Sequence, residues 1–507
     1  MRSLGRFASG PPVGPDRRRA RRAGAALALA AALLLLACGQ QQPSAARSPE
    51  PGSAPVSVSI EVNRPGRPVP PRFLGLSFEA AAMSQIATYG ERGNLVTLLR
   101  SLGPGLLRFG GVSADTRTAW TDRLTPRPAW ASGTLNAGDL RGLAKLASRS
   151  GWRVLLTVGL AHYDPTAAAR EAAAARAALG PWLAGIEVGN EPDAYGYHHL
   201  RPMPWTYARY DAEVRRYRRV IERAAPGIPL AGPGVSGSLV FESWGPGEAA
   251  GQRPALLTGH HYPLGCHQTP APSIARLLSA DTRRLESQSL HRYMSVSRAS
   301  GIPFRLDEAN SVSCGGKAGI SDTFAASLWA VGYITQTMSA GVAGINLQGN
   351  PANCRGYSPV CAARPGRLAA GVLSAKPEWY ALLLTSALIG ERPLRCTISS
   401  AGRRNVIVRA FRGPNGRLHV VIVEDDPPGT AAASIVLRVG AGYRAATVLA
   451  LAAPSPGARS GVTLGARAVA SDGSWRVPSD LQRVAARGGL ISLTVAPSSA
   501  ALLTITR

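Results

Sequence analysis

Two short segments of the chain each end an apolar run with a glutamate. In Gly185–Asp193 (Gly-Ile-Glu-Val-Gly-Asn-Glu-Pro-Asp) the run ends at Asn190-Glu191. In Ile302–Ser311 (Ile-Pro-Phe-Arg-Leu-Asp-Glu-Ala-Asn-Ser) it ends at Asp307-Glu308. Two carboxylic acids at the ends of two strands suit the hydrolysis of a glycosidic bond, one as proton donor and one as nucleophile or base. The alternative is that either glutamate is only a solvated residue at a strand end.

The elements that must position these acids alternate between short apolar runs and helical segments from about residue 70 to 390. The pattern predicts eight strands, at Phe73–Phe78, Leu106–Gly110, Arg153–Gly159, Gly185–Val188, Pro229–Gly232, Leu256–His260, Ile302–Leu306 and Val342–Leu347. It predicts helices at Leu95–Leu102, Asp139–Ser148, Ala167–Leu179, Trp205–Ala224, Ile274–Ser300 and Thr323–Ala340, with a closing helix at Pro377–Ile389. This is the pattern of a (β/α)8 barrel, in which reacting groups sit at the carboxyl ends of the strands.

An open doubly wound sheet is the competing fold. It requires a glycine-rich phosphate loop after the first strand, and Gly75–Glu79 (Gly-Leu-Ser-Phe-Glu) is not such a loop. From Leu394 onward, alternating and β-branched runs separated by Gly, Pro, Asp and Asn predict an antiparallel β-sandwich. Val56–Val62 also alternates, and we expect it to join that sandwich as an extra strand.

The N-terminus has the pattern of an export signal. Arginines at positions 17–19, 21 and 22 precede an apolar segment, Gly24–Ala37, that is too short to span a bilayer. The segment ends in Leu-Leu-Ala-Cys-Gly, which resembles the bacterial lipoprotein box and makes Cys38 the expected lipidation site; an ordinary signal cleaved nearby is the alternative. The predicted parts are therefore a signal (1–37), a tether (38–55), the extra strand (56–69), the barrel (70–390) and the sandwich (391–507).

The formal net charge of +27 does not predict a nucleic-acid partner. The first 37 residues hold seven Arg and one Asp, and the other basic residues are scattered. The densest run, Arg215–Arg219, lies on a helical pattern and is interpreted as a solvated outer face.

The cysteines other than Cys38 lack the spacing of a metal site. Cys354 and Cys361 lie in one loop and could close it, and Cys266 and Cys314 could join two loops at the barrel rim. Cys396 is then the odd one, although the sequence alone does not decide the pairing.

Several motifs together resemble glycoside hydrolase family 79, which holds β-glucuronidases and is related to heparanases. The resemblance is carried by Glu308–Trp329 and supported by Leu107–Asp115, His260–Leu264 and Tyr357–Pro359. It covers most of residues 70–390, and the predicted sandwich is similar to the family's accessory domain. It implies a retaining mechanism on a carbohydrate substrate, with neither a cofactor nor a metal.

The resemblance also implies roles for individual residues. Glu191 would be the general acid/base, which must stay protonated to donate, and Glu308 the ionised nucleophile. Asn190 would bind the sugar's 2-hydroxyl, and Tyr262 would hydrogen-bond the nucleophile. Asp307 is the alternative nucleophile, but strand alternation predicts that it points away from Glu308 into the barrel wall.

The sugar carboxylate would be bound by the loop after the nucleophile and by the segment near Tyr357. Ser313, Gly315 and Lys317 are the candidates in that loop. Family β-glucuronidases would have a tyrosine close to position 313, so Lys317 would supply the charge here, or the enzyme would prefer a neutral sugar. Glu79 is a further candidate for sugar hydroxyls.

Further rim residues have both structural and binding interpretations. Arg108 is expected to brace carboxylates inside the barrel rather than to touch substrate. Ser113 and Asp115 either line the site or form an ordinary turn. Trp120, Trp130 and Trp205 either stack on sugar faces or pack in the core.

The sequence thus predicts a lipid-anchored, exported, retaining exo-glycosidase acting on β-glucuronides. The alternatives are a related glycosidase acting on neutral β-glycosides, an endo-acting hydrolase of uronate polymers, and a catalytically silent glycan-binding lipoprotein. The oligomeric state does not follow from the sequence.

Overall fold

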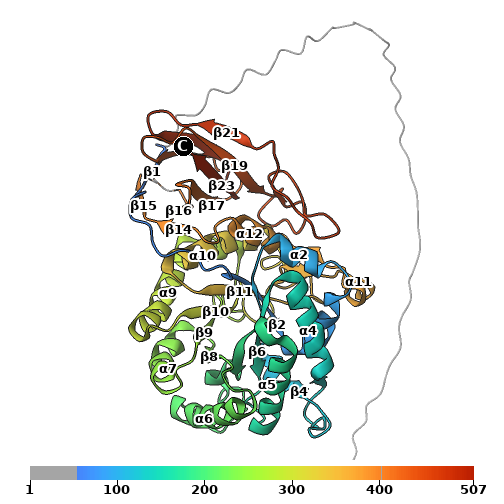
Figure 1. Ribbon diagram of the computed structural model, residues 1–507. Coiled ribbons are helices and arrows are strands. Elements are labelled where there is room, and N and C mark those ends of the chain that lie inside the picture. Colours follow the sequence, from blue (N-terminus) through green and yellow to red (C-terminus); the bar gives the residue numbers. More distant parts are fainter. Residues whose placement is uncertain (1–53, 401, 403) are drawn as a thin grey trace, which may run out of the picture. The chain divides into compact units, whose positions relative to one another are not determined.

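The computed structural model describes residues 54–507 except 401 and 403, and these residues form one compact unit (Figure 1). The predicted signal and Cys38 lie outside the described residues, as does all but the end of the predicted tether.

Eight parallel strands close into a barrel, which confirms the predicted fold (Figure 1). Around the barrel the order is β10-β11-β2-β3-β6-β7-β8-β9. The strands are β2 (Leu74–Glu79), β3 (Leu106–Gly110), β6 (Arg153–Val158), β7 (Leu183–Val188), β8 (Leu230–Val235), β9 (Leu256–His261), β10 (Phe304–Ala309) and β11 (Gly344–Gly349). Each begins and ends within a few residues of its predicted position.

Helices surround the barrel: α2 (Leu95–Ser101), α4 (Ala137–Ser150), α5 (Pro165–Leu179), α6 (Tyr207–Ala224), α7 (Ser238–Gly251), α9 (Ala280–Ser300), α10 (Phe324–Ala340) and α12 (Pro377–Ser386). The predicted helix Ile274–Ser300 is divided into α8 (Ile274–Leu277) and α9, because the Ser279 side chain caps α9. Among the described residues, no helix combines the length and the apolar character needed to cross a membrane.

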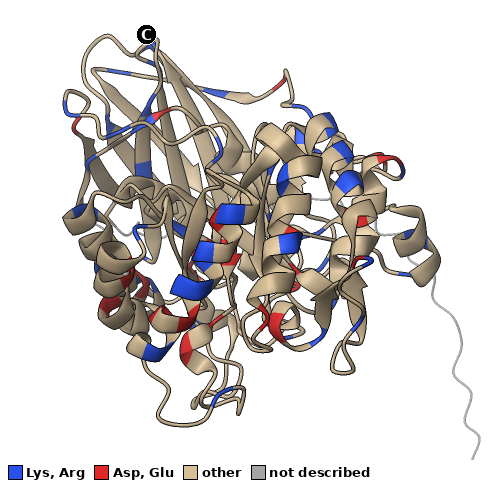
Figure 2. Cartoon of the chain, turned by 60° about the horizontal axis from the view of Figure 1, so that its bottom comes forward, with Lys and Arg blue, Asp and Glu red and all other residues tan. Residues whose placement is uncertain are grey.

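The basic residues do not form one continuous band. Lys and Arg lie on many elements of both the barrel and the C-terminal domain (Figure 2). On α6, Arg216 and Arg219 are exposed, Arg215 pairs with Asp211, and Arg218 pairs with Glu222.

The C-terminal domain contains two sheets. One has the order β15-β1-β18-β22, and the other has the order β14-β16-β17-β23-β19-β20, with β21 paired to β19. The pairs are antiparallel except β1–β18, which is parallel. The strands are β1 (Val56–Ile60), β14 (Arg392–Leu394), β15 (Cys396–Ser400), β16 (Val406–Arg412), β17 (Leu418–Glu424), β18 (Ala433–Arg438), β19 (Ala445–Ala452), β20 (Thr463–Leu464), β21 (Gln482–Ala485), β22 (Leu490–Val495) and β23 (Ser499–Thr506).

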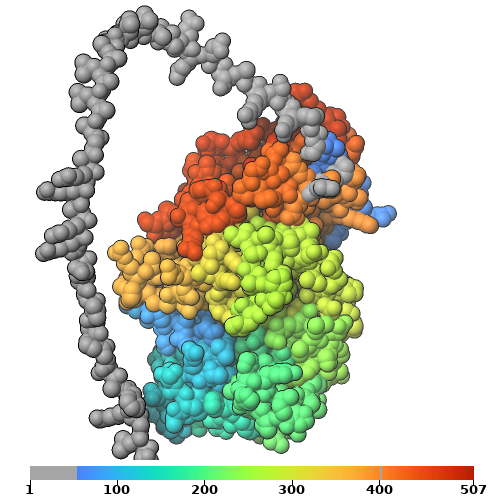
Figure 3. All heavy atoms as spheres, turned by 180° about the vertical axis from the view of Figure 1, so that it is seen from behind, coloured from blue at the N-terminus to red at the C-terminus, as the bar shows by residue number. Residues whose placement is uncertain are grey.

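The barrel and the C-terminal domain share one apolar core, and Figure 3 shows the two packed directly together. Backbone N–H groups in the first turn of α10 find their hydrogen-bond partners in the C-terminal domain. Phe324 N–H donates to the carbonyl of Ala458 (2.8 Å), and Ala325 N–H donates to the carbonyl of Pro456 (2.8 Å). The neighbouring Arg459 forms an ion pair with Asp322 at 2.9 Å. The C-terminal domain therefore completes a barrel helix.

Candidate active site

A cavity of about 530 Å³ opens at the carboxyl ends of the barrel strands. Glu191 follows β7 and Glu308 lies in β10, and both line this cavity. Three atoms lie within 4.8 Å of one another: a carboxylate oxygen of Glu191, a carboxylate oxygen of Glu308 and a ring nitrogen of His260. The structure thus brings together the two acids that were predicted to form the centre of the site.

A strained turn delivers Glu191 to the cavity. Gly189 (φ 81°) and Glu191 (φ 47°) both adopt positive φ, which is uncommon for a residue other than glycine. The Glu191 N–H donates to the carbonyl of Gly234 at 2.9 Å, and this bond secures the turn. A strained backbone of this kind persists only where the surrounding structure imposes it. Residues with such backbone conformations are often found at functional sites.

Arg108, from β3, joins the acids beneath the cavity. Its guanidinium is fully buried and pairs with Glu308 (2.7 Å), Glu187 (2.9 Å) and Asp307 (2.9 Å). It also donates to Oδ1 of Asn190 at 2.9 Å. Arg108 therefore braces carboxylates inside the barrel, the role expected for it, and fixes the Asn190 side chain.

The expected direction of Asp307 is wrong. Strand alternation predicts that Asp307 points away from Glu308, yet both carboxylates pair with the same guanidinium. The register of β10 against β9 shifts between Leu306 and Glu308, which is the signature of a bulge. The bulge interrupts alternation, so two consecutive carboxylates point into the barrel.

Two buried acids beneath the cavity, Glu187 and Asp307, have pKa values shifted in opposite directions. Burial raises the pKa of Glu187 to about 7. Burial also acts on Asp307, but the positive charges of Arg108 and His260 outweigh it and lower the pKa of Asp307 to about 2. Arg108 therefore favours the ionised form of Asp307, with which it pairs at 2.9 Å.

A chain of hydroxyl groups leads to Glu308. The Tyr262 hydroxyl donates to the Glu308 carboxylate at 2.8 Å and lies 3.3 Å from the Tyr357 hydroxyl. The Gly315 N–H donates to the Tyr357 hydroxyl at 3.1 Å. The loop after β10 is thereby connected to Glu308 through two tyrosines.

His260, at the end of β9, was not assigned a role from sequence. Its Nδ1 lies 2.9 Å from Glu191 and 3.9 Å from Glu308. Burial alone would lower the pKa of His260, but Glu308, Asp307 and the hydrogen bond to Glu191 raise it well above its usual value. The only signal in the sequence was a pair of histidines at a strand end.

The pKa of Glu191 is shifted downward, although the acid role expected of it requires a proton. Burial raises the pKa of Glu191, but the hydrogen bond from His260 and its charge outweigh burial, so the pKa lies below its usual value. The pair therefore favours a protonated His260 beside an ionised Glu191.

Asp115 and Glu79 organise the rim. Asp115 is buried and accepts hydrogen bonds from the Asn190 N–H (2.8 Å) and the Tyr195 hydroxyl (2.6 Å). Glu79 lines the cavity and accepts from the Ser113 N–H at 2.9 Å. Burial raises the pKa of Glu79, and the nearby charge of Glu308 adds to that effect.

Not every candidate reaches the cavity. The predicted residues Asn190, Ser313, Gly315 and Tyr357 line it, whereas Lys317 is exposed and is not part of the lining. The three tryptophans are not part of it either: Trp120 and Trp130 line a separate cavity, and Trp205 donates to the carbonyl of Pro192.

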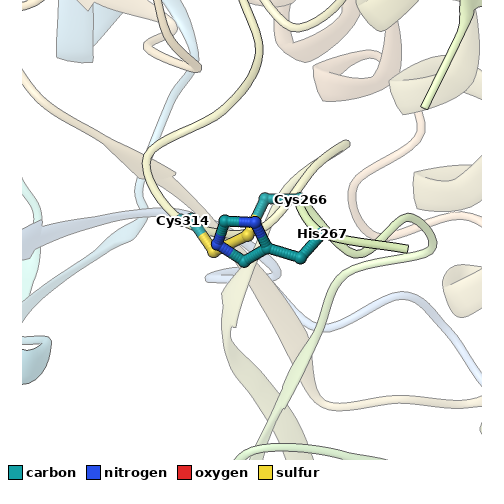
Figure 4. Close-up of side chains that lie close together, drawn as sticks. All are labelled: Cys266, His267 and Cys314. Atoms are coloured by element: carbon teal, nitrogen blue, oxygen red, sulfur yellow. A yellow bond between two sulfur atoms is a disulfide. The ribbon is translucent and has the colours of Figure 1, made fainter. Parts of the chain in front are cut away.

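Two disulfides are formed, Cys266–Cys314 and Cys354–Cys361, and Cys396 is a free thiol. The first joins the loops after β9 and β10, and Cys314 lines the cavity. His267 lies against this disulfide (Figure 4). Because both sulfurs are bonded to each other, the three residues do not offer thiolate ligands to a metal.

No family model matches the chain. A β-glucuronidase from Aspergillus niger is 28% identical over 238 residues, which is 43% of this chain and 42% of that protein. A β-glucuronidase from Neurospora crassa is 27% identical over 220 residues, 39% of this chain and 37% of that protein. The chain thus matches about two fifths of the length of these curated relatives.

Solved structures match over a larger share of the chain. A 4-O-α-L-rhamnosyl-β-D-glucuronidase from Fusarium oxysporum superposes with a TM-score of 0.70 and 17% identity, over 89% of this chain and 100% of that chain. A GH51 arabinofuranosidase from Xanthomonas axonopodis superposes with a TM-score of 0.66 and 14% identity, over 89% of this chain and 100% of that chain. The chain has the fold of the (β/α)8 glycoside hydrolases of clan A.

Proposed function

We propose that this protein is a retaining glycoside hydrolase that acts on β-glucuronides, as in glycoside hydrolase family 79. The proposal rests on one observation above all: carboxylate oxygens of Glu191 and Glu308 lie within 4.8 Å of each other in one cavity. Retaining enzymes hold their acids about 5–5.5 Å apart, whereas inverting enzymes need about 6.5–9.5 Å to admit water. The short separation supports retention.

In this mechanism a Glu308 oxygen attacks the anomeric carbon, the glycosidic C–O bond breaks, and the leaving oxygen takes a proton from Glu191. Arg108 and Tyr262 both contact the Glu308 carboxylate and hold it oriented for attack. Because the hydrogen bond and charge of His260 favour the ionised form of Glu191, a proton must pass from His260 to Glu191 before or during C–O cleavage. In the second step water attacks the glycosyl–Glu308 ester and returns a proton to the Glu191 carboxylate.

The choice of glucuronide is supported by the two curated β-glucuronidases and by the lining of the cavity. Ser313 and Tyr357 offer hydroxyl donors there, and Gln348 and Asn350 offer amides. Charge-assisted hydrogen bonds contribute about 1.5–3 kcal/mol each, so two of them would favour a glucuronide over a glucoside by more than about a hundredfold. Lys317, being outside the cavity, takes no part.

A hydrolysis panel tests this proposal. The substrates are nitrophenyl β-glucuronide, β-glucoside, β-galactoside, β-xyloside and α-L-arabinofuranoside. We expect the glucuronide to be preferred, and Tyr357→Phe to lower the glucuronide-to-glucoside ratio of kcat/KM about tenfold. The matched control Lys317→Ala should leave that ratio unchanged. Equal hydrolysis of glucoside and glucuronide, or activity on the arabinofuranoside alone, would contradict the glucuronide proposal.

We further propose that the protein is exported and held at the cell envelope by lipid on Cys38. The support is the arginine-rich start, the short apolar segment and the Leu-Leu-Ala-Cys-Gly sequence. A single acyl chain binds a membrane only marginally, so stable attachment requires more than one. The full-length protein should partition into detergent, and Cys38→Ser should move it to the aqueous phase or leave it uncleaved. An unmodified Cys38 in the mature protein would rule this out.

A further inference from the structure

A small cavity of about 110 Å³ lies apart from the catalytic one. The loop between β4 (Thr118–Trp120) and β5 (Gly133–Leu135) lines one side of it, with Trp130 and two prolines. The first half of α5 lines another side and contributes Glu171. Among the described residues, none lines both this cavity and the catalytic one. It is therefore a separate site, which the proposed reaction does not use.

Glu171 brings an unpaired carboxyl group to this cavity. The residue is 6% exposed, and within the described chain its side chain has neither a hydrogen-bond partner nor an ion-pair partner. Burial alone acts on its pKa and raises it to about 8, because no positive charge nearby opposes the effect. Buried polar groups in proteins are nearly always hydrogen-bonded. The unpaired carboxyl group thus indicates a partner from outside the chain.

A second polar group at the cavity is also unpaired. Thr118 is 6% exposed, and its Oγ1 has no hydrogen-bond partner. The other acids of the lining are already occupied. Asp115 accepts four hydrogen bonds. Asp164 caps α5 by accepting from the Ala167 N–H at 2.9 Å, which offsets the positive end of that helix.

The charge and the apolar surface of the lining suit a positively charged group on a short alkyl chain. Three acids line the cavity, and its described lining contains neither Lys nor Arg. Burial lowers the pKa of His162, so this remaining base favours its neutral form. Trp120 and Trp130 provide apolar surface, and tryptophan is the side chain that attracts cations best.

We propose that this cavity binds a primary ammonium group on a short alkyl chain, with Glu171 and Thr118 as its acceptors. A primary ammonium group has three N–H donors, which match the unpaired oxygens of these two residues. Its charge is the one that the Glu171 carboxylate lacks. A free alkylamine and the end of a lysine side chain both present this group. The inference does not depend on the proposed glycosidase activity.

Thermal unfolding of the full-length protein tests the chemistry of the ligand, at a pH above 8, where the Glu171 carboxyl ionises. A ligand that binds only the folded protein raises Tm as its concentration rises. We expect ethylammonium chloride to raise Tm more than equal concentrations of sodium chloride or tetramethylammonium chloride, because neither of these cations has an N–H donor. In a parallel arm, a rise with Nα-acetyl-lysinamide assigns the site to lysine side chains as well, and no rise assigns it to free amines.

Two variants and a matched control test the residues, with Kd for ethylammonium measured by calorimetry. Glu171→Gln keeps the size of the side chain and should raise Kd at least about tenfold, the factor of one hydrogen bond to a charged group. Thr118→Val should raise Kd less, but in the same direction. Glu248→Gln is the control, because Glu248 is also buried with a pKa of about 8 but lies outside the described lining; it should bind as the wild type does. Unchanged binding in Glu171→Gln, or equal Tm rises with the three salts, overturns the proposal.

Discussion

Nδ1 of His260 lies 2.9 Å from Oε1 of Glu191, and the imidazole is fully buried beneath the cavity. The two side chains form one titrating pair, since each shifts the pKa of the other. The proton available to the leaving group is therefore a property of the pair and not of Glu191 alone.

This pairing predicts the alkaline limb of the pH profile. A group whose pKa is raised keeps its proton until the pH passes that raised value, so activity should persist well above pH 6.5 before it falls. In His260→Gln, Glu191 alone must hold the proton, and the alkaline limb of kcat/KM should move to lower pH. A purely structural role for His260 would lower kcat without moving the limb.

The nucleophile assignment predicts that Glu308→Ala loses activity by several powers of ten. Azide added to this variant should restore part of it and yield a glycosyl azide of inverted configuration, because the small anion enters where the carboxylate was. Asp307→Asn is the informative comparison, since Asp307 points into the same network. Azide rescue in an Asp307 variant, with near-normal turnover in Glu308→Ala, would reverse the assignment.

The acid assignment predicts a dependence on the leaving group. Glu191→Ala should retain activity on substrates whose leaving group needs no proton, such as dinitrophenyl glycosides. It should lose far more on alkyl or sugar leaving groups. The measurement is the slope of log kcat/KM against leaving-group pKa, which should steepen; an unchanged slope would show that Glu191 is not the acid.

The disulfide between Cys266 and Cys314 predicts a coupled loss of stability and activity. It fixes the loop whose Gly315 N–H holds Tyr357, and its cysteines are 48 residues apart in the sequence. The double substitution Cys266→Ser, Cys314→Ser should lower the free energy of unfolding by about 2–4 kcal/mol. It should also lower kcat about tenfold, because the tyrosines lose their support. Cys396→Ser, which removes the free thiol, should change neither; a stability loss without a change in kcat would refute the coupling.

A buried carboxyl outside the site predicts how stability changes with pH. Glu171, on α5, is buried, and burial raises its pKa from an ordinary 4.5 to about 8. Below pH 4.5 the carboxyl is neutral in both the folded and the unfolded chain, and its burial costs no ionisation energy. As the pH rises from 4.5 toward 8, the unfolded chain ionises first, so the free energy of unfolding falls. Glu171→Gln should therefore gain stability over the wild type by at most about 1.4 kcal/mol per pH unit across that window. Urea unfolding at several pH values measures this, with the exposed Glu222→Gln as control.

The barrel could be predicted because its strands are continuous apolar runs. The helix α7 could not, since it contains Pro246 between Gly245 and Gly247. Its packing against α9 and β8 stabilises a segment that local propensity disfavours. Strand β23 was also missed, although it pairs with β17 and β19 at the centre of its sheet, because its Ala-Ala-Leu-Leu segment lacks alternation of polar and apolar residues.

The two central glutamates could be predicted because each ends an apolar run. Their supports could not, for two physical reasons. Asp307 depends on a bulge, and a bulge has no signature in a single strand's sequence. Glu187 and His260 act through charges contributed by other strands, and only the closed barrel brings those charges within reach.

The pairing of β1 with β15 and β18 has a consequence for biosynthesis. The strand that is made before the barrel pairs only with strands that are made after it, so the barrel is an insertion within the C-terminal domain. The first turn of α10 likewise waits for carbonyls of Ala458 and Pro456, more than a hundred residues downstream. The order of synthesis is therefore not the order of folding, and a chain released before Pro456 carries a barrel whose helix α10 lacks these partners.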